Sequence, residues 1–242
     1  MRVMTFRFNT ACFTYAVVFG TPLLFAVSYI MAAWQQHVPW CFPPIHGCTT
    51  ISETAMYAPE SYIFRFGAYP LVIFQALLFY VFKQWLEEAC GKPLKRARIA
   101  WRMALAGCVC MIGSMAVMQG PNETAEPAHT ILAVGYYLLV LSSQGLFTWE
   151  DFCHRRSERR TPLALRIGTV FLQLALLASA ALVWLVSDVF PYARYQWLLV
   201  ATFFLWHASF LFERKSVLLE PLKQTPQPVK EEASSLASAY RL

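Results

Sequence analysis

Hydroxyl, carboxylate, guanidinium and imidazole side chains gather in, or directly beside, the polar segments that follow the first, third and fifth apolar runs of this chain. The members of this group are Ser52, Glu53, Thr54, Glu60, Arg65, Glu126 and His129, with His46, Glu123, Asp188 and Arg194 in the same segments. A carboxylate beside a histidine can act as a general acid or base, and an arginine can pair with a phosphate. Three interpretations stay open: a lipid-headgroup site, a catalytic site, or a structural layer in which Glu60 and Arg65 form a salt bridge.

Six apolar runs must position these segments. They are Phe13–Trp34, Tyr62–Phe82, Ile99–Gln119, Ala128–Trp149, Leu165–Val186 and Tyr192–Phe212. Each has about 20 residues, which is what a helix needs to cross a hydrocarbon core of roughly 30 Å. A helix also pairs its own backbone groups, as lipid requires. The sequence therefore predicts an all-α polytopic membrane protein with six transmembrane helices.

The composition agrees with a membrane domain. Hydrophobic residues make up 57% of the chain and charged residues 14%, whereas a soluble domain carries about a quarter charged residues. We expect residues 1–220 to form the six-span domain and the polar segment 221–242 to be a disordered cytosolic tail. The first loop contains Pro39, Pro43 and Pro59, and prolines break helices, so we predict a structured, non-helical lumenal loop.

Basic residues occupy alternate loops. They lie near the N-terminus, in the second and fourth loops and after the sixth run: Arg2, Arg7, Lys83, Lys92, Lys95, Arg96, Arg98, Arg102, Arg155, Arg156, Arg159, Arg160, Arg166, Arg214 and Lys215. This positive-inside pattern predicts cytosolic termini and lumenal first and third loops. It also explains the net charge of +6 without nucleic-acid binding. On the predicted lumenal side, Asn122 begins a glycosylation sequon.

Cys41 and Cys48 both fall in the first loop, where an oxidising lumen would let them form a disulfide. The alternative is a metal site with His37 or His46, but the spacing matches no known zinc pattern, and we expect no metal. Haem needs facing histidines at membrane depth, and His207 is the one histidine clearly inside an apolar run. We therefore expect no cofactor.

Local patterns inside the runs make further predictions. Gly20–Pro22 predicts a kink in the first span. Ala106, Cys110 and Ser114 recur every four residues in the third span, a stripe of small residues that lets helices approach closely. The polar patch Ser142–Gly145 predicts hydrogen bonds to neighbouring helices.

The stretch from Ile51 to Phe64 resembles the Frag/DRAM/Sfk superfamily of six-span membrane proteins. The matching residues are Ser52, Glu53, Thr54, Pro59, Glu60, Ser61 and Phe64. Ala55 and Ala58 depart from the glycine and proline usual in the family. The aromatic-Arg-Phe sequence around Arg65 is similar to the branch that remodels GPI anchors, and an acid followed by histidine, here Glu126 and His129, also fits.

The resemblance implies a protein of eukaryotic endomembranes (Golgi, ER or lysosome) or plasma membrane that assists lipid handling. Family members support GPI-anchor lipid remodelling, recruit a phosphatidylinositol kinase or influence autophagy. We therefore expect membrane lipids as partners, with a headgroup held in the lumenal layer. The alternative is a non-enzymatic adaptor whose basic loops, Lys92–Arg102 and Arg155–Arg166, and tail bind a cytosolic protein. A channel is disfavoured because transport spans usually contain ionisable residues at mid-bilayer depth. Here only His207 comes near that depth.

Overall fold

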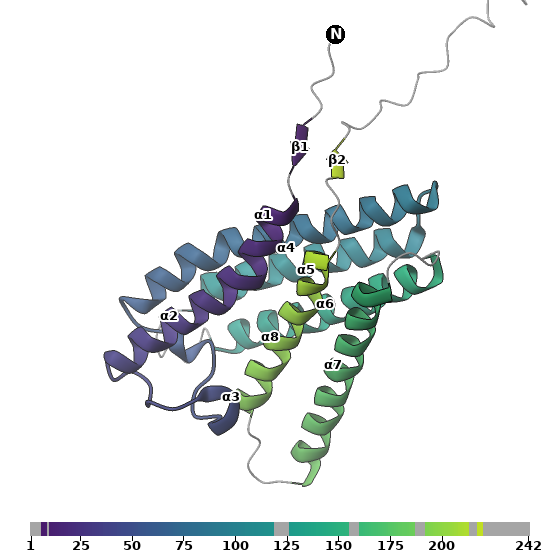
Figure 1. The fold of residues 1–242 in the computed structure, drawn as a ribbon. Helices are drawn as coiled ribbons and strands as arrows, with labels where there is room; N and C mark the ends of the chain where they lie inside the picture. The colour runs from purple at the N-terminus through teal and green to yellow at the C-terminus, as the bar shows by residue number, and fades with distance from the viewer. Residues whose placement is uncertain are drawn as a thin grey trace, which may run out of the picture. The chain divides into compact units, whose positions relative to one another are not determined.

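The computed structural model of the chain describes residues 6–8, 10–118, 126–154, 160–186, 192–212 and 217–219. Within these residues, six helices are long and apolar enough to cross a membrane. They are the first span, built from α1 (Thr10–Tyr15), the π-helical turn η1 (Ala16–Gly20) and α2 (Thr21–Trp34); α4 (Glu60–Cys90); α5 (Lys95–Val117); α6 (Glu126–His154); α7 (Arg160–Val186); and α8 (Tyr192–Ala208) with the 3-10 turn η3 (Ser209–Phe212). The predicted all-α, six-span fold is confirmed (Figure 1).

Two short strands, β1 (Phe6–Phe8) and β2 (Val217–Leu219), pair antiparallel with Phe6 opposite Leu219. They belong to a small unit of their own, separate from the helical unit of residues 10–215. The segment 221–242 lies outside the described residues, so the disordered tail stays a prediction.

The first span contains a π-helical turn at the place where Gly20 and Pro22 predicted a kink. Pro22 has no N–H to donate to the preceding turn, and a π-turn is one way in which a helix accommodates such an interruption. Val17 and Thr21, which lie in and directly after this turn, line the cavity beneath the first loop.

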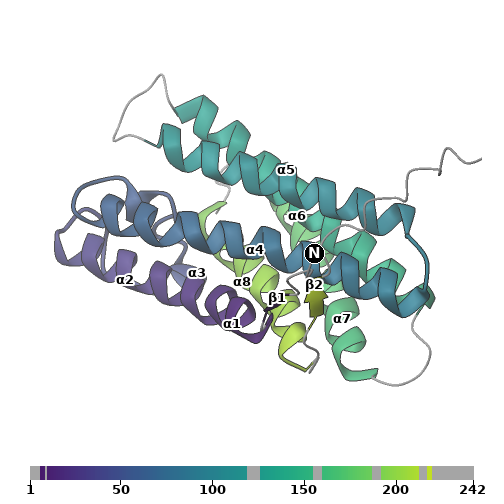
Figure 2. The same cartoon turned by 90° about the horizontal axis from the view of Figure 1, so that it is seen from above.

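α4 lies between α5 and the first span (Figures 1 and 2). α5 and α6 pack along each other, and they approach closely because Gly107 faces α6, where an added Cβ would lie 3.0 Å from Val140. Of the predicted small-residue stripe, Cys110 and Ser114 do face α6. Ala106 is exposed instead.

Residues 35–59 fold into a cap over one end of the helices, as predicted for a structured loop. The prediction that this loop is non-helical is wrong, because Pro43 and Pro44 occupy the first turn of a short helix, where a proline needs no N–H partner. The cap contains α3 (Pro43–His46) and the 3-10 turn η2 (Glu53–Ala55). Cys41 and Cys48 form the predicted disulfide. Gly47 ends α3 with a left-handed φ of 65° and lies against α8, where an added Cβ would be 3.3 Å from the Cβ of Arg194. The disulfide therefore stabilises the cap internally, and Gly47 packs it against α8.

At the opposite end, α6, α7 and α8 meet around a buried ion pair. Arg166 Nη1 donates to Asp151 Oδ2 at 2.7 Å, and Arg166 Nε donates to Ser209 Oγ at 2.8 Å. The guanidinium carbon lies 4.2 Å from the centre of the Phe82 ring. Arg166, assigned to a basic loop from the sequence, is thus 0% exposed. Asp151 and Arg166 are buried ionisable residues within the candidate spans, as His207 is. The expectation that His207 stands alone is therefore wrong.

A second polar contact joins the same helices. Gln173 Nε2 donates to Gln144 Oε1 at 2.7 Å, and both side chains are buried. The prediction that the patch around Gln144 bonds to a neighbouring helix is therefore confirmed.

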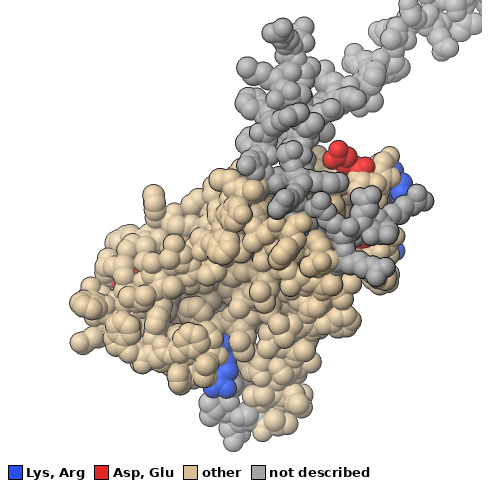
Figure 3. Space-filling view, in the orientation of Figure 1, with Lys and Arg blue, Asp and Glu red and all other residues tan. Residues whose placement is uncertain are grey.

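The outer surface of the helical unit is apolar, and charged side chains are sparse on the face shown in Figure 3. Around the cap, large aromatic side chains are exposed: Trp34, Trp40, Phe42, Tyr62 and Phe66. Such a collection is typical of the aromatic belt at a membrane–water interface.

Candidate functional site

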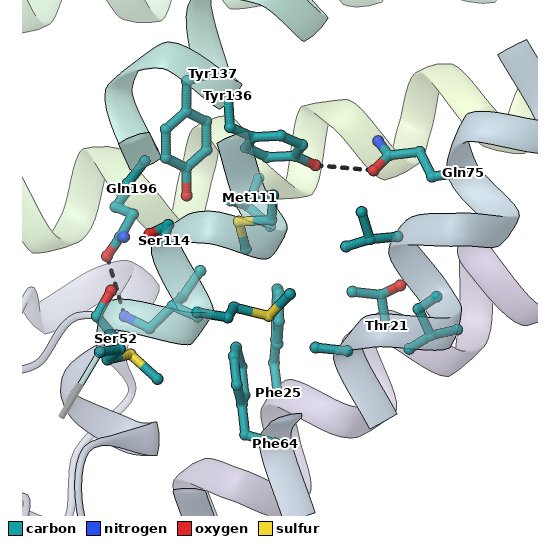
Figure 4. Close-up of a pocket in the computed structure, with 18 of the residues that line it drawn as sticks. Thr21, Phe25, Ser52, Phe64, Gln75, Met111, Ser114, Tyr136, Tyr137 and Gln196 are labelled. Atoms are coloured by element: carbon teal, nitrogen blue, oxygen red, sulfur yellow. Dashed lines mark hydrogen bonds between the residues drawn. The ribbon is translucent and has the colours of Figure 1, made fainter. Parts of the chain in front are cut away.

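A cavity of about 50 Å³ lies beneath the cap, between the first span, α4, α5, α6 and α8 (Figure 4). Its wall is mostly apolar and includes Phe25, Phe64, Met111, Met115 and Phe204. The cavity is partly open to the outside. Among the described residues, no aspartate, glutamate, lysine or arginine lines it. The cavity therefore suits an apolar or neutral group rather than an ion.

The cap end of the cavity carries a hydrogen-bonded chain of serine, histidine and serine. Ser52 Oγ lies 2.9 Å from His129 Nε2, while His129 Nδ1 lies 2.9 Å from Ser114 Oγ and 3.0 Å from the Ser114 carbonyl oxygen. Since a carbonyl oxygen only accepts, we assign the proton of the neutral imidazole to Nδ1. His129 Nε2 then accepts the proton of the Ser52 hydroxyl, and the cap is joined to α5 and α6.

α8 holds the cap segment that carries Ser52. The Ile51 N–H donates to Gln196 Oε1 at 3.0 Å, as the dashed line beside Gln196 in Figure 4 shows. The indole N–H of Trp197 donates to the carbonyl oxygen of Thr49 at 2.9 Å. Because these two bonds fix the backbone just before Ser52, its hydroxyl stays at the cavity wall.

The other end of the cavity carries a second polar pair. The Tyr136 hydroxyl donates to Gln75 Oε1 at 3.1 Å, and Figure 4 shows this pair across the cavity from Ser52. Gln75 and Tyr136 are 4% and 7% exposed. The cavity is therefore apolar along its wall and polar at two separate places.

Glu53 and Thr54, both headgroup candidates, have local hydrogen bonds. The Glu53 carboxylate accepts from the Thr49 hydroxyl at 2.9 Å and from the Thr50 N–H at 2.7 Å. The Thr54 hydroxyl donates to the Ile51 carbonyl oxygen at 2.7 Å. These bonds stabilise the turn around η2, and neither residue lines the cavity.

The salt bridge predicted between Glu60 and Arg65 is wrong. Glu60 is fully buried, and its Oε1 lies 2.6 Å from His37 Nδ1. Arg65 Nη2 donates instead to the carbonyl oxygen of Met118, at the end of α5. Glu60 ties the start of α4 to the cap through the His37 imidazole, while Arg65 faces α5.

Other candidates stand apart from the cavity or outside the described residues. The imidazole of His46 contacts the backbone of Phe42 within the cap, and Arg194 is exposed. Glu126 begins α6, but its side chain is outside the described residues, as are Asn122, Glu123 and Asp188. The sequon and these acids stay predictions.

The serine–histidine contact raises the question of acyl transfer, because a histidine that accepts a serine proton can activate a nucleophile. Such chemistry also needs donors for the developing oxyanion. The two N–H groups that follow Ser52 are engaged, since Glu53 N donates to Thr50 Oγ1 at 3.0 Å and Thr54 N to Thr50 O at 3.3 Å. In the described part of the chain, no three His, Cys, Asp or Glu side chains are placed to hold a metal ion.

Sequence reasoning missed most polar residues of this cavity: Thr21, Gln75, Tyr136, Tyr137 and Gln196. Gln75 and Tyr136 lie within long apolar runs, and Gln196 lies near the start of the last run. The available signal was an isolated amide in an apolar span, which is costly in lipid and is therefore usually turned inward. Ser114 was predicted only as a packing residue, yet it orients His129.

Comparison with known proteins gives one positive result. The chain matches a protein-family model described as the Frag1/DRAM/Sfk1/Cwh43P N-terminal domain over residues 9–217, which confirms the resemblance seen around Ser52. No curated protein and no solved structure matches the chain significantly.

Proposed function

We propose that this chain, which belongs to the Frag1/DRAM/Sfk1/Cwh43P N-terminal domain family, binds a membrane lipid in the cavity beneath its cap and assists in handling that lipid. One observation carries the proposal: an apolar, partly open cavity whose cap end presents Ser52 and His129. Ligand sites typically combine an apolar wall with a few placed polar groups. A lipid has the same division between hydrocarbon and polar part.

The exposed aromatic residues around the cap support a location at the membrane interface. Trp and Tyr side chains prefer the headgroup level of a bilayer, and Trp34, Trp40 and Tyr62 are exposed there. At that depth, Ser52 and His129 would meet the polar part of a lipid, and the hydrocarbon would extend toward α5 and α6. The loop charges favour a lumenal or extracellular cap, with both termini in the cytosol.

The size of the cavity limits what it encloses. A volume of about 50 Å³ holds on the order of three or four water-sized groups. The cavity therefore takes one part of a lipid, and the remainder stays in the bilayer through the open side. Such partial enclosure suits a protein that presents a lipid to another component better than one that sequesters it.

The proposed role is the lipid handling that the family resemblance implies, either GPI-anchor lipid remodelling or a phosphoinositide-related step, in Golgi, ER, lysosome or plasma membrane. Among the earlier candidates, Ser52 contacts the lipid through its hydroxyl oxygen, and His129, which bonds to Ser52 and Ser114, orients that hydroxyl at the cavity wall. Glu53, Thr54 and Glu60 hold the cap in place, and Arg65 joins α4 to the end of α5.

Native mass spectrometry of the purified chain tests this function. We expect wild type to retain a defined lipid, and Ser52→Ala and His129→Ala to retain about five- to tenfold less, since each removes one hydrogen-bonding group worth about 1 kcal/mol. His46→Ala is the matched control, because His46 is also in the cap end but does not line the cavity. Equal lipid retention in all four proteins, or none in wild type, contradicts the proposal.

A second candidate function is an adaptor, and one observation favours it. The turn between α4 and α5 and the first turns of α5 carry a row of exposed basic side chains: Lys92, Lys95, Arg96, Arg98 and Arg102. Residues 155–159 of the other basic loop lie outside the described residues, and Arg166 is buried. The α4–α5 turn is therefore the surface to test for a cytosolic protein partner.

Proximity labelling in cells separates the two functions. We compare wild type with Lys95→Gln/Arg96→Gln/Arg98→Gln, whose changes are remote from the cavity. A cytosolic protein labelled by wild type and lost in the variant supports the adaptor. Identical labelling, together with unchanged lipid retention, excludes this surface and leaves lipid binding.

A further inference from the structure

Gln75 lies in the middle of α4, it is 4% exposed, and it lines the cavity. Its Oε1 accepts from Tyr136, whereas no described residue accepts from its Nε2. A buried amide N–H without an acceptor is costly. Such a group in a cavity wall indicates a partner that occupies the cavity.

The contact with Tyr136 defines the orientation assigned to the amide. The Tyr136 hydroxyl donates its one proton to Gln75 Oε1. In this orientation the Nε2 hydrogens are the groups offered to a ligand. Gln75 is a donor site, held in orientation by a residue from the facing helix.

The two polar places of the cavity are separated along the axis of α6. His129 and Tyr136 lie on α6 two turns apart, which is about 10 Å along the helix axis at 1.5 Å per residue. Between His129 and Tyr136, α6 contributes the apolar side chain of Ala133 to the wall. A ligand whose polar end is at Ser52 and His129 would thus need a hydrogen-bond acceptor about two helical turns deeper to reach Gln75.

We propose that the Gln75 amide donates a hydrogen bond to an acyl carbonyl oxygen of the bound lipid, so that the site selects acyl lipids over ether lipids. This inference rests on the proposed lipid binding. A carbonyl oxygen fits because it only accepts and needs no second partner. A phosphate does not fit, because no described lysine or arginine lines the cavity to balance its charge.

The test uses matched lipids that differ in the carbonyl groups alone. Dioleoyl phosphatidylcholine and the corresponding dialkyl ether phosphatidylcholine compete for the purified full chain. Native mass spectrometry measures how much of each lipid the protein retains. We expect wild type to prefer the diacyl lipid about five- to tenfold, the value of one buried hydrogen bond. Gln75→Leu should lose that preference and keep the wild-type affinity for the ether lipid.

Two further variants keep the result interpretable. Gln84→Leu is the matched control, because Gln84 is on the same helix, bonds to Tyr80 and does not line the cavity; it should keep the preference. If Gln75→Leu does not fold, Tyr136→Phe serves, since it frees the amide to rotate and should weaken the preference. Sphingomyelin distinguishes the source of the carbonyl, because its acyl group is joined by an amide. Sphingomyelin binding that depends on Gln75 would identify an amide rather than an ester as the acceptor.

The outcomes separate this inference from the proposed function. If wild type binds both phosphatidylcholines equally, and His129→Ala weakens both, a water molecule satisfies Gln75 and the inference is overturned while lipid binding stands. If wild type retains none of the three lipids, both fail. A preference that persists in Gln75→Leu also overturns the inference.

Discussion

Two buried polar clusters lie at opposite ends of the same helices, and their surroundings differ. In the cap half, Ser52 and His129 border the cap end of a cavity and Gln75 borders its deeper end. At the other end, Arg166 and Asp151 form an ion pair covered by aromatic rings. The first cluster lines open space and can meet a ligand, whereas the second is enclosed by side chains, where Arg166 bonds to Asp151 and Gln173 to Gln144. We infer that the first cluster binds and the second holds α6, α7 and α8 together.

The largest effect should follow from breaking the ion pair. Arg166→Leu removes the guanidinium that pairs with the buried Asp151 carboxylate, and losing one partner of a buried pair costs about 3–5 kcal/mol. Thermal unfolding of the purified chain should show this loss. The double variant Asp151→Leu/Arg166→Leu should be more stable than the single one, because it removes both charges of the pair. If Arg166→Leu is as stable as wild type, the ion pair does not hold α6, α7 and α8 together.

Removing the disulfide should have the next largest effect, and at the cap end alone. Cys41 and Cys48 are seven positions apart, and a ring of that size contributes about 2–3 kcal/mol in the chain-entropy account. In Cys41→Ser/Cys48→Ser, hydrogen exchange should rise in residues 35–59 and lipid retention should fall, because the cap carries Ser52. Cys12→Ser/Cys153→Ser, which changes two exposed free cysteines, is the control. Faster exchange spread evenly over all helices would contradict a cap that is stabilised locally.

The same substitution in each cluster sharpens the contrast. Gln144→Leu removes the acceptor of Gln173, and Gln75→Leu removes the acceptor of Tyr136. Each also deletes an amide Nε2 from which no described residue accepts, so both should lower the free energy of unfolding by a similar amount, about 1–3 kcal/mol. Lipid retention should separate them, falling in Gln75→Leu and not in Gln144→Leu. Equal lipid retention in the two variants would erase the distinction between the ends.

The last prediction expects no effect at all: Ser52 should not react as a nucleophile. A lipid-like fluorophosphonate should leave no adduct there, since the neighbouring N–H groups of Glu53 and Thr54 are already engaged. Peptide mass spectrometry after labelling gives the answer. An adduct on Ser52 that disappears in His129→Ala would show an activated nucleophile and would replace binding with acyl transfer.

The six spans and the disulfide were predictable because they depend on short-range features. An apolar run of about 20 residues has few alternatives to a membrane helix, and Cys41 and Cys48 are close in the chain. The motif around Ser52 and His129 also identified the family that the comparison confirms. These features do not require knowledge of which helix faces which.

The residues that line the cavity depend on which side of each helix faces its neighbours. A single sequence does not specify this directly. Glu53 and Ser52 are adjacent and both polar, yet Glu53 bonds within its own turn and Ser52 reaches α6. Arg166 looks like the last member of a basic loop, but α7 begins before it and turns it inward. Gln75 is one amide in an apolar run, and its position on the cavity follows from how α4, α5 and α6 pack.

The central claim is that the cavity beneath the cap is a lipid site, and filling it is the most direct measurement. Ala133 lines the cavity on α6, and Ala128 is exposed on the same helix. Native mass spectrometry should find the wild-type lipid on Ala128→Phe and lose it on Ala133→Phe, with both variants folded by thermal unfolding. Equal lipid retention in the two folded variants would contradict the account.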